Sequence, residues 1–156
     1  MLIELSNQEC LSGSFNGPSL METLRSLSPG EAASSKTYEG YSAWGVALHV
    51  LYFKQLVGTE LGAEIPDYTY EKADFPKLTD EVTQETWDKL LSDLEATHRG
   101  FIDAFAAVSE EALEAEHAAW KIPLRKSVAW VICHDTSHNA QIRSMGLPSL
   151  KKPVKG

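Results

Sequence analysis

The chain has 156 residues, of which 43% are hydrophobic, a composition that suits a single compact domain with one buried core. It carries 14 Lys and Arg residues against 22 Asp and Glu, and the formal net charge of -8 disfavours nucleic acid as a partner, because such a surface repels phosphate. No stretch approaches the roughly 20 consecutive apolar residues of a membrane span, and the first residues lack the apolar run of a signal peptide, so we expect a soluble cytoplasmic protein with no membrane partner.

The N-terminal region predicts two short helices, at about 6–15 and 18–27, which together make the first arm of a helical bundle. Both helix starts carry a capping-box pattern, in which a Ser side chain and a Glu three residues later satisfy free backbone N–H groups. These patterns are Ser6-x-x-Glu9 and Ser19-x-x-Glu22. Ser28-Pro29-Gly30 predicts one further helical turn.

Helical periodicity predicts three longer helices, at about 41–61, 83–108 and 124–145. In the second of these, apolar residues from Trp87 to Phe105 recur at spacings of three and four, as expected for a helix with one buried face. Pro123 and Gly146 bound the last helix, and Ser109 can cap a short helix before it. The sequence therefore predicts an all-α four-helix bundle over residues 1–150, followed by a flexible tail at 151–156.

One connection, at about 63–82, is unusually long and shows no clear period. Its aromatic residues include Tyr68, Tyr70 and Phe75. Long loops in compact domains are commonly functional or disordered, and aromatic residues favour a functional loop that covers the mouth of a pocket. An equally good interpretation is a loop that only completes the hydrophobic core.

The last predicted helix contains His134-Asp135-Thr136-Ser137-His138, which places two imidazoles at i and i+4. Their Cα atoms are expected about 6 Å apart on one helix face, so both rings can converge on one cation. Both positions fall on the inward face of the helix. Because two buried imidazoles are unfavourable without partners, a metal ion is the partner we expect.

His49 is the predicted third ligand, because it interrupts the apolar run Leu48-His49-Val50-Leu51 in the middle of a helix. A lone histidine of this kind is usually a hydrogen-bonded core residue. The paired histidines on another helix make a metal ligand the better interpretation of His49, since helical bundles build metal sites from side chains on facing helices. Three neutral imidazoles leave coordination positions open for water or substrate, which is the pattern of a catalytic site.

The remaining candidate residues have simpler interpretations. We expect His98 to be a buried, hydrogen-bonded histidine, with a partner of the metal ligands or a fourth ligand as the alternatives, and His117 to lie at the surface. Asp135 stands where zinc proteases carry the Glu of HExxH, but no ligand residue follows His138, so Asp135 is expected beside the ligands or at the surface. Cys10 and Cys133 form no CxxC pair and are expected to be reduced thiols, the second of them buried.

The chain resembles the DinB-like superfamily, which includes YfiT-type proteins and thiol-dependent transferases. The resemblance covers nearly the whole chain and rests on three segments: Phe15-Asn16-Gly17-Pro18-Ser19-Leu20, Ser42-Ala43-Trp44 leading to His49, and His134-x-x-x-His138 followed by Gln141-Ile142 and Gly146-Leu147-Pro148. It implies a four-helix bundle, a three-histidine site for Ni, Zn or a similar cation, and a homodimer. Ala140 and Asn16 depart from residues that many relatives carry there, but neither is a proposed ligand.

The enzymes of this superfamily use low-molecular-weight thiols such as bacillithiol, mycothiol or glutathione, which makes a thiol-dependent S-transferase the first functional expectation and a hydrolase the second. The metal would lower the pKa of a bound thiol or water. Zn and Ni are the expected ions, and Fe, Co and Mn also suit three imidazoles. The pocket residues expected around the site are Trp44, Tyr52, His98, Trp130 and Gln141. The alternatives are a non-catalytic metal-binding stress-response protein and a plain helical bundle with incidental histidines.

Overall fold

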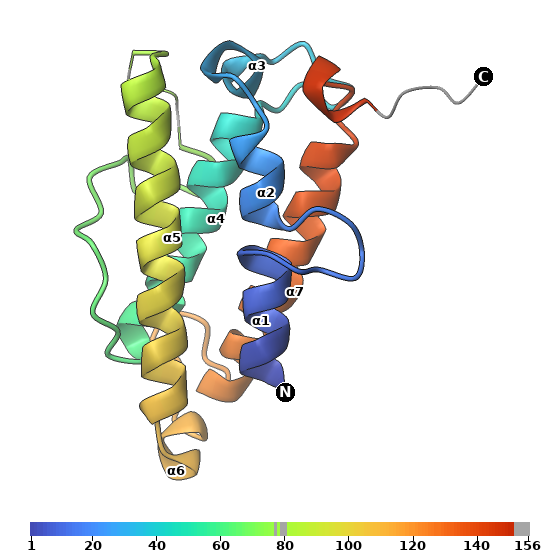
Figure 1. The fold of residues 1–156 in the computed structure, drawn as a ribbon. Coiled ribbons are helices and arrows are strands. Elements are labelled where there is room, and N and C mark those ends of the chain that lie inside the picture. Colours follow the sequence, from blue (N-terminus) through green and yellow to red (C-terminus); the bar gives the residue numbers. More distant parts are fainter. Residues whose placement is uncertain (77, 79–80, 152–156) are drawn as a thin grey trace.

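The computed structural model describes residues 1–76, 78 and 81–151 (Figure 1). The described residues form helices and contain no β-strand beyond one isolated bridge between Glu116 and Pro123. The helices in chain order are α1 (Leu2–Cys10), α2 (Leu20–Arg25), α3 (Pro29–Ala33), α4 (Ala43–Glu60), α5 (Gln84–Ala107), α6 (Glu110–Leu113), α7 (Leu124–Arg143) and the 3-10 turn η1 (Pro148–Leu150). The predicted all-α class is confirmed.

The long helices α4, α5 and α7 form the body of the fold. α4 packs along both α5 and α7, while α1 and α2 follow one another beside α7 and also contact α5 (Figure 1). Most residues of α4 are buried, as its nearly continuous apolar sequence requires. α4 is therefore the central helix, and its middle turns face two neighbouring helices.

Most helix starts follow the predicted capping chemistry. The Ser19 hydroxyl accepts the Glu22 N–H at 3.3 Å, and the Glu22 carboxylate accepts the Ser19 N–H at 2.8 Å, which completes the predicted capping box. Ser28 and Glu31 form a second box at the start of α3, and Ser109 caps α6. Local side-chain chemistry thus sets these boundaries.

The predicted capping box of Ser6 and Glu9 is wrong. α1 begins at Leu2, so Ser6 lies inside the helix with its side chain buried. The Glu9 carboxylate instead accepts the Ser14 hydroxyl at 3.0 Å, in the connection that follows α1. That connection also explains why α1 ends before residue 15, since Gly13 has a φ of +89°, a left-handed value that cannot continue a helix.

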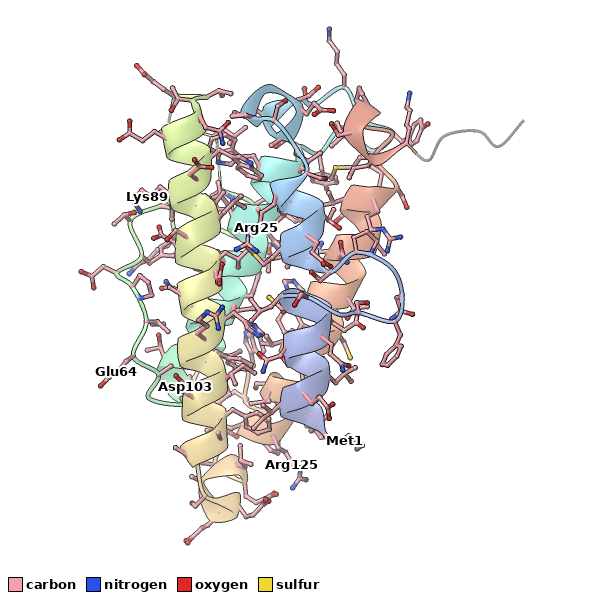
Figure 2. All side chains as sticks on the ribbon, in the orientation of Figure 1. Met1, Arg25, Glu64, Lys89, Asp103 and Arg125 are labelled. Carbon is pink, nitrogen blue, oxygen red and sulfur yellow. The ribbon has the colours of Figure 1, made fainter. Side chains whose placement is uncertain are left out.

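The long connection between α4 and α5 lies close against α5 at its start. A Cβ atom at Gly100 would lie 2.2 Å from the Glu64 carbonyl oxygen, so only glycine permits this approach. Further along, the Tyr70 hydroxyl donates to the Asp93 carboxylate at 2.7 Å, and Lys89 lies over the Tyr70 ring. Glu64 and Lys89, labelled in Figure 2, show the two places where this connection meets α5.

No helix in the described part of the chain is both long and apolar enough to cross a bilayer. The predicted tail at 151–156 lies outside the described residues except for Lys151, and so do residues 77, 79 and 80 of the predicted loop.

Candidate metal centre

Three histidines meet where α4 packs on α7. His134 and His138 occupy successive turns of α7, and His49 faces them from the middle of α4. The ring centroids of His134 and His138 are 4.3 Å apart. The centroid of His49 lies 4.8 Å from that of His134 and 4.5 Å from that of His138. One ligand nitrogen from each ring falls within 4.8 Å of the other two, so the group can hold a metal ion.

In two of these rings, Nδ1 points away from the other histidines and has a hydrogen-bond acceptor. That hydrogen bond orients the ring so that its Nε2 faces the other histidines. His49 Nδ1 lies 2.5 Å from the Asp74 carbonyl oxygen, and His138 Nδ1 lies 2.7 Å from Gln141 Oε1. A carbonyl oxygen only accepts, so each Nδ1 carries the proton and each Nε2 presents a lone pair. The Gln141 amide in turn donates to the Glu39 carboxylate at 2.9 Å, which fixes its orientation. Such partners are the usual supports of metal-binding histidines.

The environment keeps the imidazoles of His134 and His138 neutral. Burial, together with the neighbouring His138 and His49 rings, lowers the pKa of His134 to about 3. Burial also lowers the pKa of His138, against an opposing effect of its bond to Gln141. A neutral imidazole is the form that binds a metal ion, so these two rings are ready to do so near neutral pH without losing a proton.

The spacing of the nitrogens suits a first-row transition metal. Two imidazole nitrogens bound about 2.1 Å from one ion, at angles of about 90 to 110°, lie about 3.0 to 3.4 Å apart. His49 Nε2 and His134 Nε2 are 2.9 Å apart, close to this range, and all three ligand nitrogens lie within 4.8 Å of one another. Three imidazole nitrogens are ligands that divalent transition metals accept, so the group can hold a metal ion.

Aromatic side chains surround the three histidines. Phe75, from the connection after α4, stacks on His49 with centroids 4.2 Å apart and planes 9° apart. Trp130, one turn before His134 on α7, stacks on that ring at 4.2 Å, and Phe53 meets it edge-on. His49 is 6% exposed and His134 is 9% exposed, while His138 is half-buried. Two of the three rings are therefore shielded from solvent, and His138 is the most exposed of the three.

The predicted pocket residues divide into two groups. Trp130 and Gln141 lie against the histidines, as described above. Trp44 packs instead on Trp87 in the core, with ring centroids 4.9 Å apart. Tyr52 turns toward Tyr68 and lines a separate hollow of about 270 Å³ between α4 and the connection that follows it. The structure thus places both residues away from ring contact with the three histidines.

His98, the last of the predicted pocket residues, belongs to a different buried cluster. Its Nδ1 lies 2.9 Å from the Lys54 ammonium and its Nε2 lies 2.9 Å from the Asn7 side-chain oxygen, so the expectation of a buried, hydrogen-bonded histidine is confirmed. Burial lowers the pKa of His98 to about 2, with the Lys54 charge acting in the same direction. Asp135 also points into this cluster, where it pairs with Lys54 at 2.5 Å, and it does not reach the surface.

Two expectations about exposure are wrong. His117 is fully buried, because its Nδ1 accepts the backbone N–H groups of Ala119 and Trp120 and its ring stacks on Trp120. Cys133 is exposed, since the neighbouring His134 faces inward and adjacent helix positions point about 100° apart. Both cysteines are free thiols, as predicted.

Sequence reasoning missed the contacts of Asp74 and Phe75 with the histidines, although Phe75 is one of the aromatic residues of the connection for which a cover over a pocket mouth is an expectation. Both residues lie in a connection without periodicity, where no pattern predicts which atoms meet the histidines. Lys54, which belongs to the buried cluster around His98, was also missed, although a charged residue in the apolar middle of a helix is a usable signal.

Comparisons with known proteins add no relative: no family model, no curated protein and no solved structure matches the chain.

Proposed function

We propose that the chain is a four-helix bundle of the DinB-like type, in which α1 and α2 together make one arm and α4, α5 and α7 make the other three. The placement of α1 and α2 in succession beside α7 supports this arrangement. So does the position of the three histidines, which face each other from α4 and α7, the helices on which the resemblance places them.

The proposed function is that of a metal-dependent enzyme with His49, His134 and His138 as ligands of one divalent ion, Zn or Ni in the first place. The observation that carries it is the convergence of three ligand nitrogens within 4.8 Å, two of them with their outer N–H groups already paired. A cation held there would supply Lewis acidity, lowering the pKa of a thiol or water so that an anionic nucleophile is available near neutral pH.

The chain's own residues supply the surroundings that this chemistry needs. The bonds from His49 to Asp74 and from His138 to Gln141 hold two ligand rings in one orientation. Phe75 and Trp130 exclude water from two of the rings, which strengthens electrostatic interactions inside the site. The half-buried side at His138 is the direction of approach for a small substrate. We propose a low-molecular-weight thiol as that substrate, with S-transfer as the reaction and hydrolysis as the second choice.

Metal analysis of protein prepared without a histidine tag tests the site. The expected result is about one transition-metal ion per chain, and much less in His49→Ala and His138→Ala variants that keep their helical signal. Cys133→Ser, on the same helix but exposed, is the matched control and should retain the ion. Full metal content in both histidine variants would show that the proposed ligands are wrong.

Activity requires a second assay, in which metal-loaded protein is screened with low-molecular-weight thiols and electrophiles. Turnover above the metal-free control, lost in His138→Ala, would support the enzyme. A homodimer is part of the same proposal, and sedimentation analysis of the loaded protein tests it.

A non-catalytic metal-binding protein is the second candidate, and one observation favours it. Phe75 covers the face of His49, and two of the three rings are more than nine-tenths buried. A metal-loaded protein that retains its ion but turns over no thiol or ester substrate would support this alternative.

A further inference from the structure

Lys54 is a buried cation in the middle of the fold. Lys54 is 1% exposed, and the residues that precede it in α4 are mostly apolar. The ammonium lies 2.5 Å from Asp135 Oδ2, 2.9 Å from His98 Nδ1 and 3.4 Å from Cys10 Sγ. A charge in the core is tolerated only when it is paired and hydrogen-bonded, and here three groups do this together.

The three groups around the ammonium form a metal-type ligand set. Cys10 comes from α1, His98 from α5 and Asp135 from α7, and their ligand atoms lie within 4.8 Å of one another. A thiolate, an imidazole and a carboxylate are the ligands that Zn²⁺ and Co²⁺ accept in proteins. The Lys54 nitrogen stands at hydrogen-bonding distance from each of them, where a bound ion would be.

We propose that Cys10, His98 and Asp135 form a second cation site whose resident cation is the Lys54 ammonium. The Lys54 side chain therefore excludes a metal ion from this site. Replacing Lys54 by a small residue creates a site for a divalent transition metal. This inference does not depend on what the three-histidine group binds.

Charge balance supports the exchange of one cation for the other. Burial raises the pKa of the Cys10 thiol to about 12, so that thiol is neutral. Burial also raises the pKa of Asp135, but the Lys54 ammonium 2.5 Å away opposes this effect, and the close pair keeps the carboxylate charged. With Lys54 present, the cluster therefore contains one carboxylate and one ammonium, and its net charge is zero. A divalent ion would displace the thiol proton to solvent and bind the thiolate. Two positive charges would then balance one thiolate and one carboxylate, and the net charge would again be zero. Both cations together would leave excess charge in the core.

The test uses a background in which the three-histidine group is disabled by His49→Ala and His138→Ala. Cobalt(II) is the probe, because a thiolate bound to Co²⁺ gives a charge-transfer absorption in the near ultraviolet that imidazoles alone do not give. With Lys54 present, we expect no such absorption. With Lys54→Ala added, we expect about one Co²⁺ per chain and a thiolate absorption, and Cys10→Ala on top of it should abolish both.

Two results would overturn the proposal. Thiolate absorption in the background protein that retains Lys54 would mean that the ammonium does not exclude the metal. A folded Lys54→Ala protein that binds no Co²⁺ would mean that the three ligands do not make a site.

Loss of Lys54 leaves a buried carboxylate unpaired, so the variant can fail to fold without metal. In that case the readout is the helical circular dichroism signal with and without Zn²⁺. Restoration of that signal by Zn²⁺, absent when Cys10→Ala is added, is the expected result. A chain that stays unfolded with Zn²⁺ would also overturn the proposal.

Discussion

The Nε2 atoms of His49 and His134 lie 2.9 Å apart across the interface of α4 and α7. Because the Asp74 carbonyl oxygen accepts a hydrogen bond from His49 Nδ1–H, the lone pair of His49 Nε2 faces His134 Nε2. This short separation is favourable when His134 Nε2 carries a proton or when both nitrogens share a cation.

Gln141 should control metal affinity without contacting the ion. Gln141→Ala removes the acceptor of His138 Nδ1–H, and loss of such a partner typically weakens metal binding about 10- to 100-fold. A competition titration with a chromophoric chelator measures the change. Glu39→Gln combined with Gln141→Glu keeps an acceptor for His138 and should restore most of the affinity. Unchanged affinity in Gln141→Ala would show that the hydrogen bond does not orient the ligand.

Phe75 should slow the escape of the bound ion. Its ring stacks on His49, and an aromatic pair contributes about 0.5 to 1.5 kcal/mol, so Phe75→Ala should speed metal release to a chelator about two- to tenfold. The free energy of unfolding should fall by a similar amount, because Phe75 is 38% exposed and lies outside the main core. Phe15→Ala, at a residue that is 89% exposed, is the control and should release the ion at the original rate.

The metal-free protein should lose stability as the pH falls below about 6.5. In the unfolded chain His98 and His134 titrate near 6.5, whereas burial lowers their folded pKa values to about 2 and about 3. The unfolded state therefore binds more protons below pH 6.5, and each histidine contributes a slope of up to about 1.4 kcal/mol per pH unit.

Urea unfolding in the presence of a chelator, between about pH 7 and pH 5, measures this slope above the range in which exposed carboxylates titrate. Burial raises the pKa of Asp135, and this shift acts on the slope in the opposite direction. His134→Ala should lower this slope by up to about 1.4 kcal/mol per pH unit, which corresponds to one proton fewer taken up on unfolding. A free energy of unfolding that stays constant over this range would contradict the assignment of neutral, buried imidazoles.

Substitutions at Trp44 and Trp130 should have different effects, the first mainly on the free energy of unfolding and the second mainly on metal binding. Trp44→Ala empties a fully buried position against Trp87 and should cost about 3 to 5 kcal/mol of unfolding free energy while metal content stays at one ion per chain. Trp130→Ala removes the partly exposed ring that covers His134, so it should cost less stability and loosen metal binding. Denaturant unfolding and metal analysis of the two variants give the comparison, and the opposite pattern would contradict the placement of both rings.

The helices and the histidine group were accessible from sequence for a specific reason. Helical spacing fixes which side chains share a face, so it predicts that His134 and His138 lie together on the inward face of α7. The apolar run around His49 predicts that this residue is buried in the same interior. Spacing along one helix does not reveal which neighbouring helix a residue meets. For that reason Trp44 was expected beside the histidines although it packs on α5.

The remaining errors have local causes. The sequence around Ser6 matches a capping box, but α1 begins at Leu2. The Met1 carbonyl oxygen accepts the Leu5 N–H at 3.0 Å, which forms a helical hydrogen bond ahead of any that Ser6 could start. His117 follows acidic residues and was therefore expected at the surface, whereas two backbone N–H groups of a tight turn draw its ring inward. The contacts of Asp74 and Phe75 depend on the path of an irregular connection, which no periodic pattern encodes.

α4 carries His49 and Lys54 five residues apart, which turns the second about 140° around the helix axis from the first. Each side chain meets a different set of partners, so the five-residue interval fixes both clusters at once. Inserting or deleting one residue between these positions would rotate one of them by about 100° and leave its partners facing a different side chain. The length of this segment should therefore be far less tolerant of insertion than the connections at the ends of the helix.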